Sequence, residues 1–161
     1  MSELERALER VIGRDSLVVC IGNYMRRDDA AGLIVCRLVK SSIDTDRVVE
    51  CEGGLENCLS IIGRLKPKRI LVVDAADFNG EPGDVVLTDA SNCDLNLELY
   101  STHKIPLSMM KDFVEKAYNV ESVWVLGIKP LDTSLGFGVS KRVLESCRRV
   151  AIAIIRVLSS L

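Results

Sequence analysis

The amino-acid sequence predicts an α/β fold in which helices cover both faces of a mostly parallel β-sheet. Short apolar runs alternate along the chain with longer segments whose apolar residues recur every three or four positions, and this alternation is typical of parallel sheets. One apolar run, over residues 85–87, follows its predecessor too closely for a parallel crossover, which predicts one antiparallel strand. The 161 residues are enough for one domain, residues 1–161, with a full hydrophobic core.

The first half of the chain predicts a helix followed by strand, helix, strand and helix. Ser2 and Glu5 have the spacing of a capping box, and apolar residues then fall on one helical face until Gly13. A nearly continuous apolar run that ends at Gly22 predicts a strand buried on both faces. The same patterns predict strands over residues 17–21 and 48–51 and helices over residues 30–40 and 55–65.

The second half begins with the most apolar strand, "RILVVDAAD", which ends in acidic residues. Asn79-Gly80 and Pro82-Gly83 predict turns, so the strand over residues 85–87 should run antiparallel to its predecessor. Polar residues 89–103 indicate a loop. We expect a helix over residues 107–118, a buried strand over residues 122–128 and a last helix capped by Ser140. The resulting sheet is mixed and five-stranded, with one antiparallel strand.

Composition narrows the classes of function. The chain is 48% hydrophobic and 27% charged, and a net charge of -2 provides no general basic field for nucleic acid or for an anionic membrane. The longest apolar stretches are too short to span a membrane, and acidic residues near the N-terminus do not fit a signal peptide. We therefore expect a cytoplasmic protein without membrane insertion or nucleic acid.

The six cysteines include no C-x-x-C pair and no zinc-knuckle spacing. Most of them lie among apolar residues, where a thiol packs as a small hydrophobic group, so we expect reduced core cysteines. A catalytic thiol needs an accessible, electropositive setting, which the sequence does not indicate. Disulfides stay open as an alternative if the source is a hyperthermophile.

Polar residues that could carry chemistry follow three of the predicted parallel strands. They occupy residues 23–29, residues 52–54 and residues 74–77. Ligands of open α/β sheets gather outside the carboxyl ends of the strands, so these segments should lie at one edge. Asp28, Asp29 and Asp74 each have a plainer alternative, since a carboxylate at a helix start or strand end can simply cap backbone N–H groups.

His103 is the only histidine of the chain and lies in a polar loop that leads into a helix. Together with two carboxylates it would form a mixed oxygen and nitrogen ligand set, which suits a first-row divalent metal with open positions. Other sites are disfavoured, because the sequence lacks G-x-S-x-G, H-E-x-x-H, G-x-G-x-x-G and phosphate-loop motifs. A nucleotide-binding, flavodoxin-like domain would need such a phosphate loop.

Five segments of the chain, taken in order, are "IGNYMRRDDAAG", "ECEGGLEN", "ILVVDAADFNGEPGDVVL", "STHKIPLSMM" and "VWVLGIKP". Together they resemble the nickel-iron hydrogenase maturation endopeptidases. The resemblance spans Leu17 to about Val143, and it is closest to the branch that processes the large subunit of formate-hydrogenlyase-type hydrogenases. It implies a three-layer α/β/α fold, phosphorylase/hydrolase-like, with a mixed five-stranded sheet.

The resemblance also implies an activity. Such enzymes are hydrolases that remove a C-terminal extension from the hydrogenase large-subunit precursor after nickel insertion, and the nickel carried by the precursor is the recognition signal. Another divalent metal could occupy the site in vitro. The competing hypothesis is a non-catalytic α/β module that binds the metallated large subunit as a chaperone or checkpoint.

The family's metal-ligand positions, which are also its catalytic positions, fall on Asp29, Asp74 and His103. On this interpretation Asp28 caps the helix and Asp29 faces the metal. The sequence departs from the common pattern where Arg27 precedes the acidic pair, where Ala30 replaces a frequent glycine, and where Glu52 replaces a usual aspartate. No ligand is lost, and Arg26 and Arg27 are placed to select an acidic partner surface.

Overall fold

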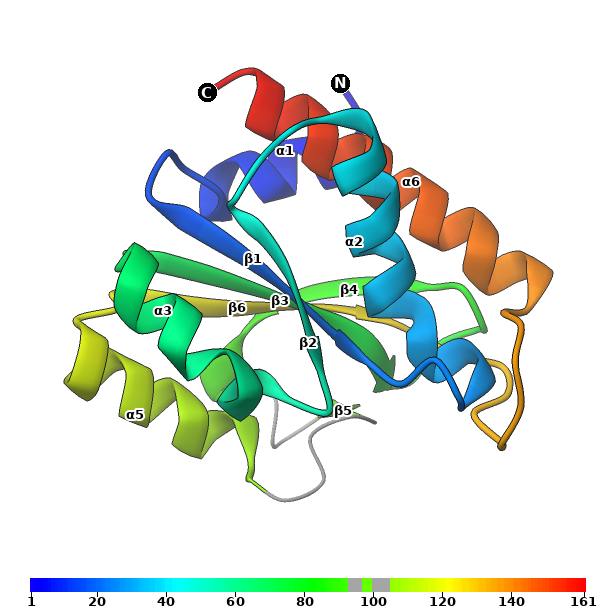
Figure 1. The fold of residues 1–161 in the computed structure, drawn as a ribbon. Coiled ribbons are helices and arrows are strands. Elements are labelled where there is room, and N and C mark those ends of the chain that lie inside the picture. The colour runs from blue at the N-terminus through cyan, green and yellow to red at the C-terminus, as the bar shows by residue number, and fades with distance from the viewer. Residues whose placement is uncertain (93–96, 100–104) are drawn as a thin grey trace.

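The computed structural model describes residues 1–92, 97–99 and 105–161, and it has the predicted three-layer α/β/α architecture (Figure 1). Five strands lie in the order β2-β1-β3-β6-β4, and a short β5 pairs with β3, so the described residues form a six-stranded sheet where five strands were predicted. The helices, single-turn helices and strands are α1 (Glu3–Val11), β1 (Ser16–Gly22), η1 (Arg27–Ala30), α2 (Ala31–Ser42), β2 (Val48–Glu52), η2 (Leu55–Cys58), α3 (Leu59–Leu65), β3 (Arg69–Asp77), β4 (Val85–Asp89), η3 (Ala90–Asn92), β5 (Glu98–Leu99), α5 (Leu107–Tyr118), β6 (Ser122–Ile128) and α6 (Lys141–Ser159).

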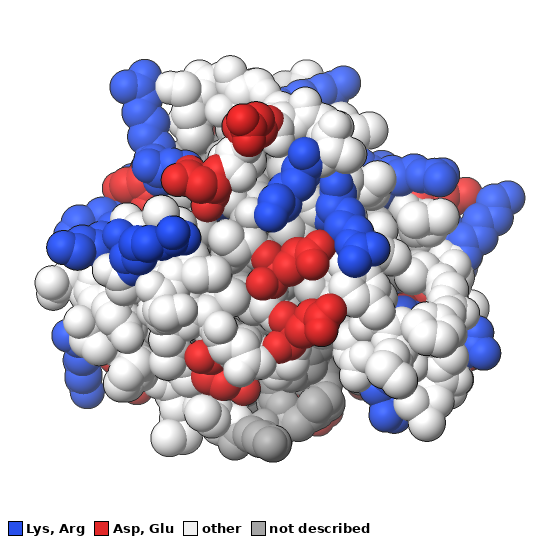
Figure 2. Space-filling view, in the orientation of Figure 1, with Lys and Arg blue, Asp and Glu red and all other residues white. Residues whose placement is uncertain are grey.

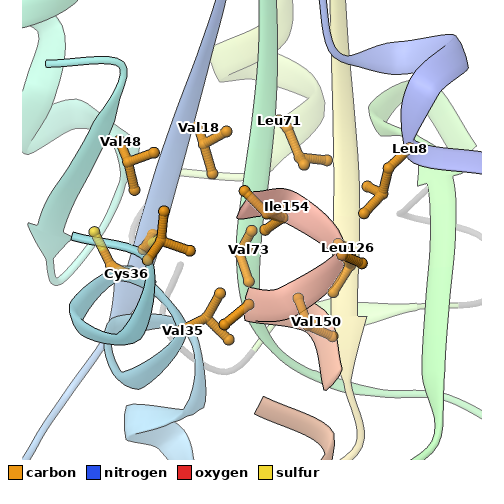
Figure 3. Close-up of a cluster of buried hydrophobic side chains, with 14 of the residues drawn as sticks. Leu8, Val18, Val35, Cys36, Val48, Leu71, Val73, Leu126, Val150 and Ile154 are labelled. Carbon is orange, nitrogen blue, oxygen red and sulfur yellow. The ribbon is translucent and has the colours of Figure 1, made fainter. Parts of the chain in front are cut away.

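Helices cover both faces of the sheet (Figure 1), and alternating side chains of the central strands are buried against these two helical layers. Val18 of β1 and Leu71 of β3 pack with α1, α2 and α6, whereas Val19 and Val72 pack with α3 and α5. Because neighbouring residues of a strand point to opposite faces, a run of apolar residues supplies both cores. Figure 3 shows the first core, where Ile154 of α6 lies among residues of the sheet.

The antiparallel strand has the predicted direction, and its neighbour in the sheet is β6. β4 pairs with β6 rather than with β3, so β6 lies between β3 and β4. The physical reason is burial: every residue of β4 is only half-buried, which suits an edge strand, whereas β6 is largely buried and takes the inner position.

The predicted boundaries need three further corrections. The helix expected over residues 55–65 is divided into η2 and α3. The loop expected over residues 89–103 contains η3 and β5, whose two residues are too few to leave a pattern. Ser140 precedes α6 as predicted, but its side chain makes no capping hydrogen bond to that helix. Ser2 does form the predicted capping box with Glu5.

Candidate active site

The loop after β1 folds back on itself and thereby fixes the position of Asp29. The N–H of Asn23 donates to the carbonyl of Asp29, 3.2 Å away, and the Asn23 side chain accepts from the N–H of Met25 at 2.9 Å. A Cβ at Gly22 would overlap the Asp29 carbonyl, so glycine allows this close return. The G-N pair of the motif therefore has a structural role, which is to close the loop that carries the acidic pair.

Asp29 lies in η1 and is 2% exposed. The next helix, α2, begins directly after η1 and packs closely against the carboxyl ends of two strands. A Cβ at Gly32 would overlap the carbonyl oxygens of Ile21 and Val73. The close packing of α2 against β1 and β3 therefore requires glycine at position 32. This packing holds Asp29 at this edge of the sheet.

The prediction that Asp28 caps the helix that follows it is wrong. Its carboxylate is fully buried and accepts hydrogen bonds from the N–H groups of Leu131 and Asp132, at 2.9 and 3.1 Å. The N–H and the hydroxyl of Ser140 donate to it as well, each at 2.6 Å. Asp28 therefore ties the first loop to the loop after β6 and lies at the N-terminus of α6, where the helix dipole favours a negative charge.

Asp74 lies on β3, in register with Gly127 of β6, and is fully buried. β3 is the neighbour of β1 in the sheet and runs parallel to it, so Asp74 and the loop of Asp29 belong to the same edge. η1, which carries Asp29, contacts β3 directly. The structure thus places two buried aspartates on η1 and β3, which contact each other at the carboxyl ends of the two central strands.

His103, the third predicted ligand, lies outside the described residues. On its N-terminal side, β5 pairs with the end of β3, where Leu99 is in register with Ala76. On its C-terminal side, α5 begins at Leu107. Within residues 1–92, 97–99 and 105–161, no group of three or more His, Cys, Asp or Glu side chains is arranged to hold a metal ion. Of the three predicted ligands, Asp29 and Asp74 lie in the described part.

The glycine pair after β2 joins the same edge. The N–H of Gly53 donates to the Gly22 carbonyl at 3.3 Å, and Gly53 and Gly54 have φ angles of 86° and 149°, which favour glycine. Glu52, which replaces the family's usual aspartate, is exposed. This turn therefore braces the base of the first loop.

A disulfide between Cys51 and Cys58 closes the glycine turn, with Cα atoms 5.9 Å apart. The expectation of reduced cysteines is therefore wrong for this pair. It holds for Cys20, Cys36 and Cys147, which are free and buried. Burial raises the pKa of the Cys20 thiol, and burial together with the charge of Asp28 raises the pKa of Cys147 to about 12. A thiol with a raised pKa is a poor nucleophile, which disfavours these two as catalytic groups.

Tyr24 anchors the first loop from outside, a role that no motif in the sequence indicates. Its hydroxyl donates to the carboxylate of Glu50 at 3.1 Å, and the Arg37 guanidinium lies 4.2 Å from its ring centroid. Arg37 also forms an ion pair with Glu50, at 3.4 Å. Burial and the hydrogen bond to Glu50 raise the pKa of Tyr24 above its usual value. The tyrosine stays a neutral donor and links the loop to α2 and β2.

The face that includes the edge strand β2 carries charges of both signs. Figure 2 shows acidic side chains along the middle of this face, with basic side chains on either side. The acidic residues of β2 are Glu50 and Glu52.

In the part of the chain that the structure describes, no helix is long and apolar enough to cross a lipid bilayer.

Comparisons with known proteins give the same family as the motifs. Residues 34–157 match the family model HycI, described as hydrogenase maturation protease; the match includes the position of Asp74 and begins after Asp29. The chain is 31% identical to the hydrogenase 3 maturation protease of Escherichia coli K12 over 116 residues, which are 71% of this chain and 72% of that protein. It is 28% identical to a putative hydrogenase maturation protease of Methanocaldococcus jannaschii over 136 residues, 78% of this chain and 79% of the relative.

Solved structures agree in fold. The crystal structure of the [NiFe] hydrogenase maturation protease HycI from Thermococcus kodakarensis superposes with a TM-score of 0.81 at 28% identity, and the match covers 95% of this chain and 99% of that one. The solution structure of the endopeptidase HycI from Escherichia coli gives a TM-score of 0.72 at 26% identity, covering 88% and 89% of the two chains. The chain therefore belongs to the family of hydrogenase maturation proteases, and it is an endopeptidase of that family.

Proposed function

We propose that this protein removes the C-terminal extension of a nickel-iron hydrogenase large-subunit precursor after nickel insertion, with the inserted nickel as its recognition signal. The observation that carries the proposal is the pair of buried carboxylates, Asp29 and Asp74, on neighbouring parallel strands and their loops. Family membership supports the class of reaction, and the carboxylate pair supports a metal-bearing substrate.

The donor set suits a metal that arrives with the substrate. Two ionised carboxylates close together at a buried edge would repel each other, and a divalent cation between them would relieve that repulsion. With the imidazole of His103 they would supply two oxygen donors and one nitrogen donor, which suit first-row divalent metals. Three protein ligands leave coordination positions for the groups of the precursor that already hold the nickel. Another divalent ion could take the same position in vitro.

In this proposal the residues of this chain bind the metal of the precursor and hold the binding side chains in position. Asp29, Asp74 and His103 would contact the metal carried by the precursor. The closed first loop keeps Asp29 in place, and pairing with β6 keeps Asp74 in place. A metal held there can polarise the scissile carbonyl or activate a water molecule. Because the metal belongs to the substrate, precursor without nickel would lack the group that completes the reactive site.

The experiment compares nickel-loaded and nickel-free precursor with matched variants of one strand. Asp74→Asn should abolish cleavage of nickel-loaded precursor. Asp77→Asn, three residues further on the same strand, should cleave normally, since the Asp77 side chain is 54% exposed and pairs at the surface with Lys129, at 3.2 Å. Gel mobility of the precursor reads out both.

The alternative of a non-catalytic checkpoint predicts a different gel. In that case wild-type protein would bind nickel-loaded precursor and leave its length unchanged. Equal cleavage by Asp74→Asn and wild type would also overturn the proposed site, because a neutral amide oxygen binds a divalent metal more weakly than a carboxylate does.

A further inference from the structure

Four large apolar side chains are exposed on two loops beside the candidate active site. Met25 is 59% exposed, Leu131 64%, Leu135 70% and Phe137 76%. We call these four residues the apolar rim. Exposed apolar side chains scattered singly are ordinary, but a group of four on adjoining loops is typical of an interaction surface.

The two loops form one unit. Met25 and Gly136 are joined by a hydrogen bond from the Gly136 N–H to the Met25 carbonyl, 2.9 Å, and the N–H of Arg27 donates to the Gly136 carbonyl at 3.0 Å. Figure 1 shows the orange loop after β6 next to the blue loop after β1. The buried Asp28 carboxylate holds the same pair of loops from beneath.

The two loops that carry the apolar rim contain uncommon backbone angles. Arg27 has a φ of 46°, in the left-handed region, and Gly136 and Gly138 have φ angles of 141° and 100°. The cross-loop hydrogen bonds offset the cost of holding such angles. A surface that is ordered before it binds loses little conformational entropy on binding, so the exposed side chains of the apolar rim are presented in a form ready for a partner.

The charged residues that flank the apolar rim give it a basic margin around an apolar centre. The Arg27 guanidinium donates to the Phe137 carbonyl at 3.2 Å and lies 3.7 Å from the Asp132 carboxylate, so its charge is compensated within the rim. Arg26, the residue before it, is exposed and adds a second positive charge at the margin. The complementary surface would therefore be apolar with an acidic side chain at its margin.

The apolar rim is continuous with the candidate active site. Asp29 follows Met25 by four residues, and its N–H donates to the Arg26 carbonyl at 3.0 Å. A protein seated on the apolar rim would present its neighbouring surface to Asp29. We propose, on the basis of the proposed function, that the apolar rim is the docking surface for the hydrogenase large-subunit precursor, and that it binds a surface of the precursor next to the nickel.

This assignment separates recognition into two parts. The apolar rim touches the polypeptide of the precursor, so its contribution to binding is the same with and without nickel. The carboxylates touch the metal, so their contribution requires nickel. Binding to the nickel-free precursor therefore isolates the apolar rim from the metal-dependent step.

The test measures Kd by calorimetry for wild type, the double variant Leu135→Ser/Phe137→Ser and the control Ile152→Ser. Ile152 is 47% exposed on α6 and lies outside the two loops. The double variant should raise Kd about tenfold or more for nickel-free and nickel-loaded precursor alike, since buried aromatic anchors dominate interfaces. Ile152→Ser should leave Kd unchanged. At saturating precursor, kcat of the double variant should stay near that of wild type.

An unchanged Kd of the double variant, while wild-type protein cleaves the precursor, would overturn the docking surface. If wild type also self-associates by sedimentation and the double variant does not, the apolar rim would instead be an interface between copies of this chain. If wild type cleaves no precursor, the proposed function fails separately, because Kd for nickel-free precursor still decides the role of the apolar rim.

Discussion

The Asp28 carboxylate accepts hydrogen bonds from both the N–H and the hydroxyl of Ser140, although the two residues are 112 positions apart in the chain. With Leu131 and Asp132 as further donors, this single buried side chain connects the loop after β1, the loop after β6 and the start of α6. Asp28 is therefore a structural tie, whereas its neighbour Asp29 is the residue proposed to meet the metal.

Replacing Asp28 by alanine should destabilise the fold strongly. The change leaves buried N–H donors without an acceptor, and the loss should be about 3 kcal/mol in the free energy of unfolding. Urea denaturation of Asp28→Ala measures it. Asp44→Ala, at an exposed position, is the control and should change stability by less than about 0.5 kcal/mol. Similar unfolding of Asp28→Ala and the control would contradict the role of Asp28 as a tie.

Gly32→Ala tests the seat of α2 on the sheet. The added methyl group would overlap the carbonyl oxygens of Ile21 and Val73, which cannot move without breaking the sheet, so a loss of about 3 kcal/mol or more is expected. The control is Gly63→Ala in α3, where the new Cβ would lie 3.1 Å from the Tyr118 ring edge, a side chain that can shift. Equal melting temperatures of the two variants would argue against the close seat.

The Cys51–Cys58 disulfide encloses a short loop, so its removal should have a moderate effect. The loop-entropy relation gives about 2.5 kcal/mol for a loop of this length. We expect Cys51→Ala/Cys58→Ala to lower the free energy of unfolding by about 2 kcal/mol. Dithiothreitol should destabilise wild type and leave the double variant unchanged. An equal effect of the reductant on both proteins would show that the stabilising bond is not this one.

Thiol-directed reagents should leave processing intact. Cys20, Cys36 and Cys147 are buried, and burial raises the thiol pKa of the first and the last of these. Treatment with iodoacetamide, followed by the precursor assay and by mass spectrometry, checks this. Labelling of one cysteine in step with complete loss of activity, in protein whose circular dichroism stays native, would instead point to a catalytic thiol.

Local patterns in the sequence were enough to predict most elements. β6 and α5 have the predicted bounds, because the apolar pattern that indicates a strand or a helix depends on residues close together in the sequence. Two features escaped because their partners are distant: β4 lies beside β6 rather than β3, and Asp28 binds Ser140 rather than its own helix. β5 has only two residues and leaves no periodic signal.

The candidate site was predictable in part for a topological reason. Parallel strands end at one edge, so the order of strands and helices alone leads one to expect Asp29 and Asp74 together. The apolar rim could not be predicted, since Met25, Leu135 and Phe137 meet only through the hydrogen bonds between two loops. Exposed apolar residues in a loop have no periodicity that would reveal them.

The central claim is that Asp74 grips the metal of the substrate and contributes little to the fold. Because asparagine has nearly the same shape and lacks the charge, Asp74→Asn should fold with the stability of wild type or slightly above it. The most direct measurement pairs thermal melts with cleavage of nickel-loaded and nickel-free precursor by wild type and by this variant. We predict cleavage only by wild type and only of nickel-loaded precursor, with equal melting of the two proteins. Cleavage of both precursor forms by wild type, or unfolding of Asp74→Asn, would contradict the claim.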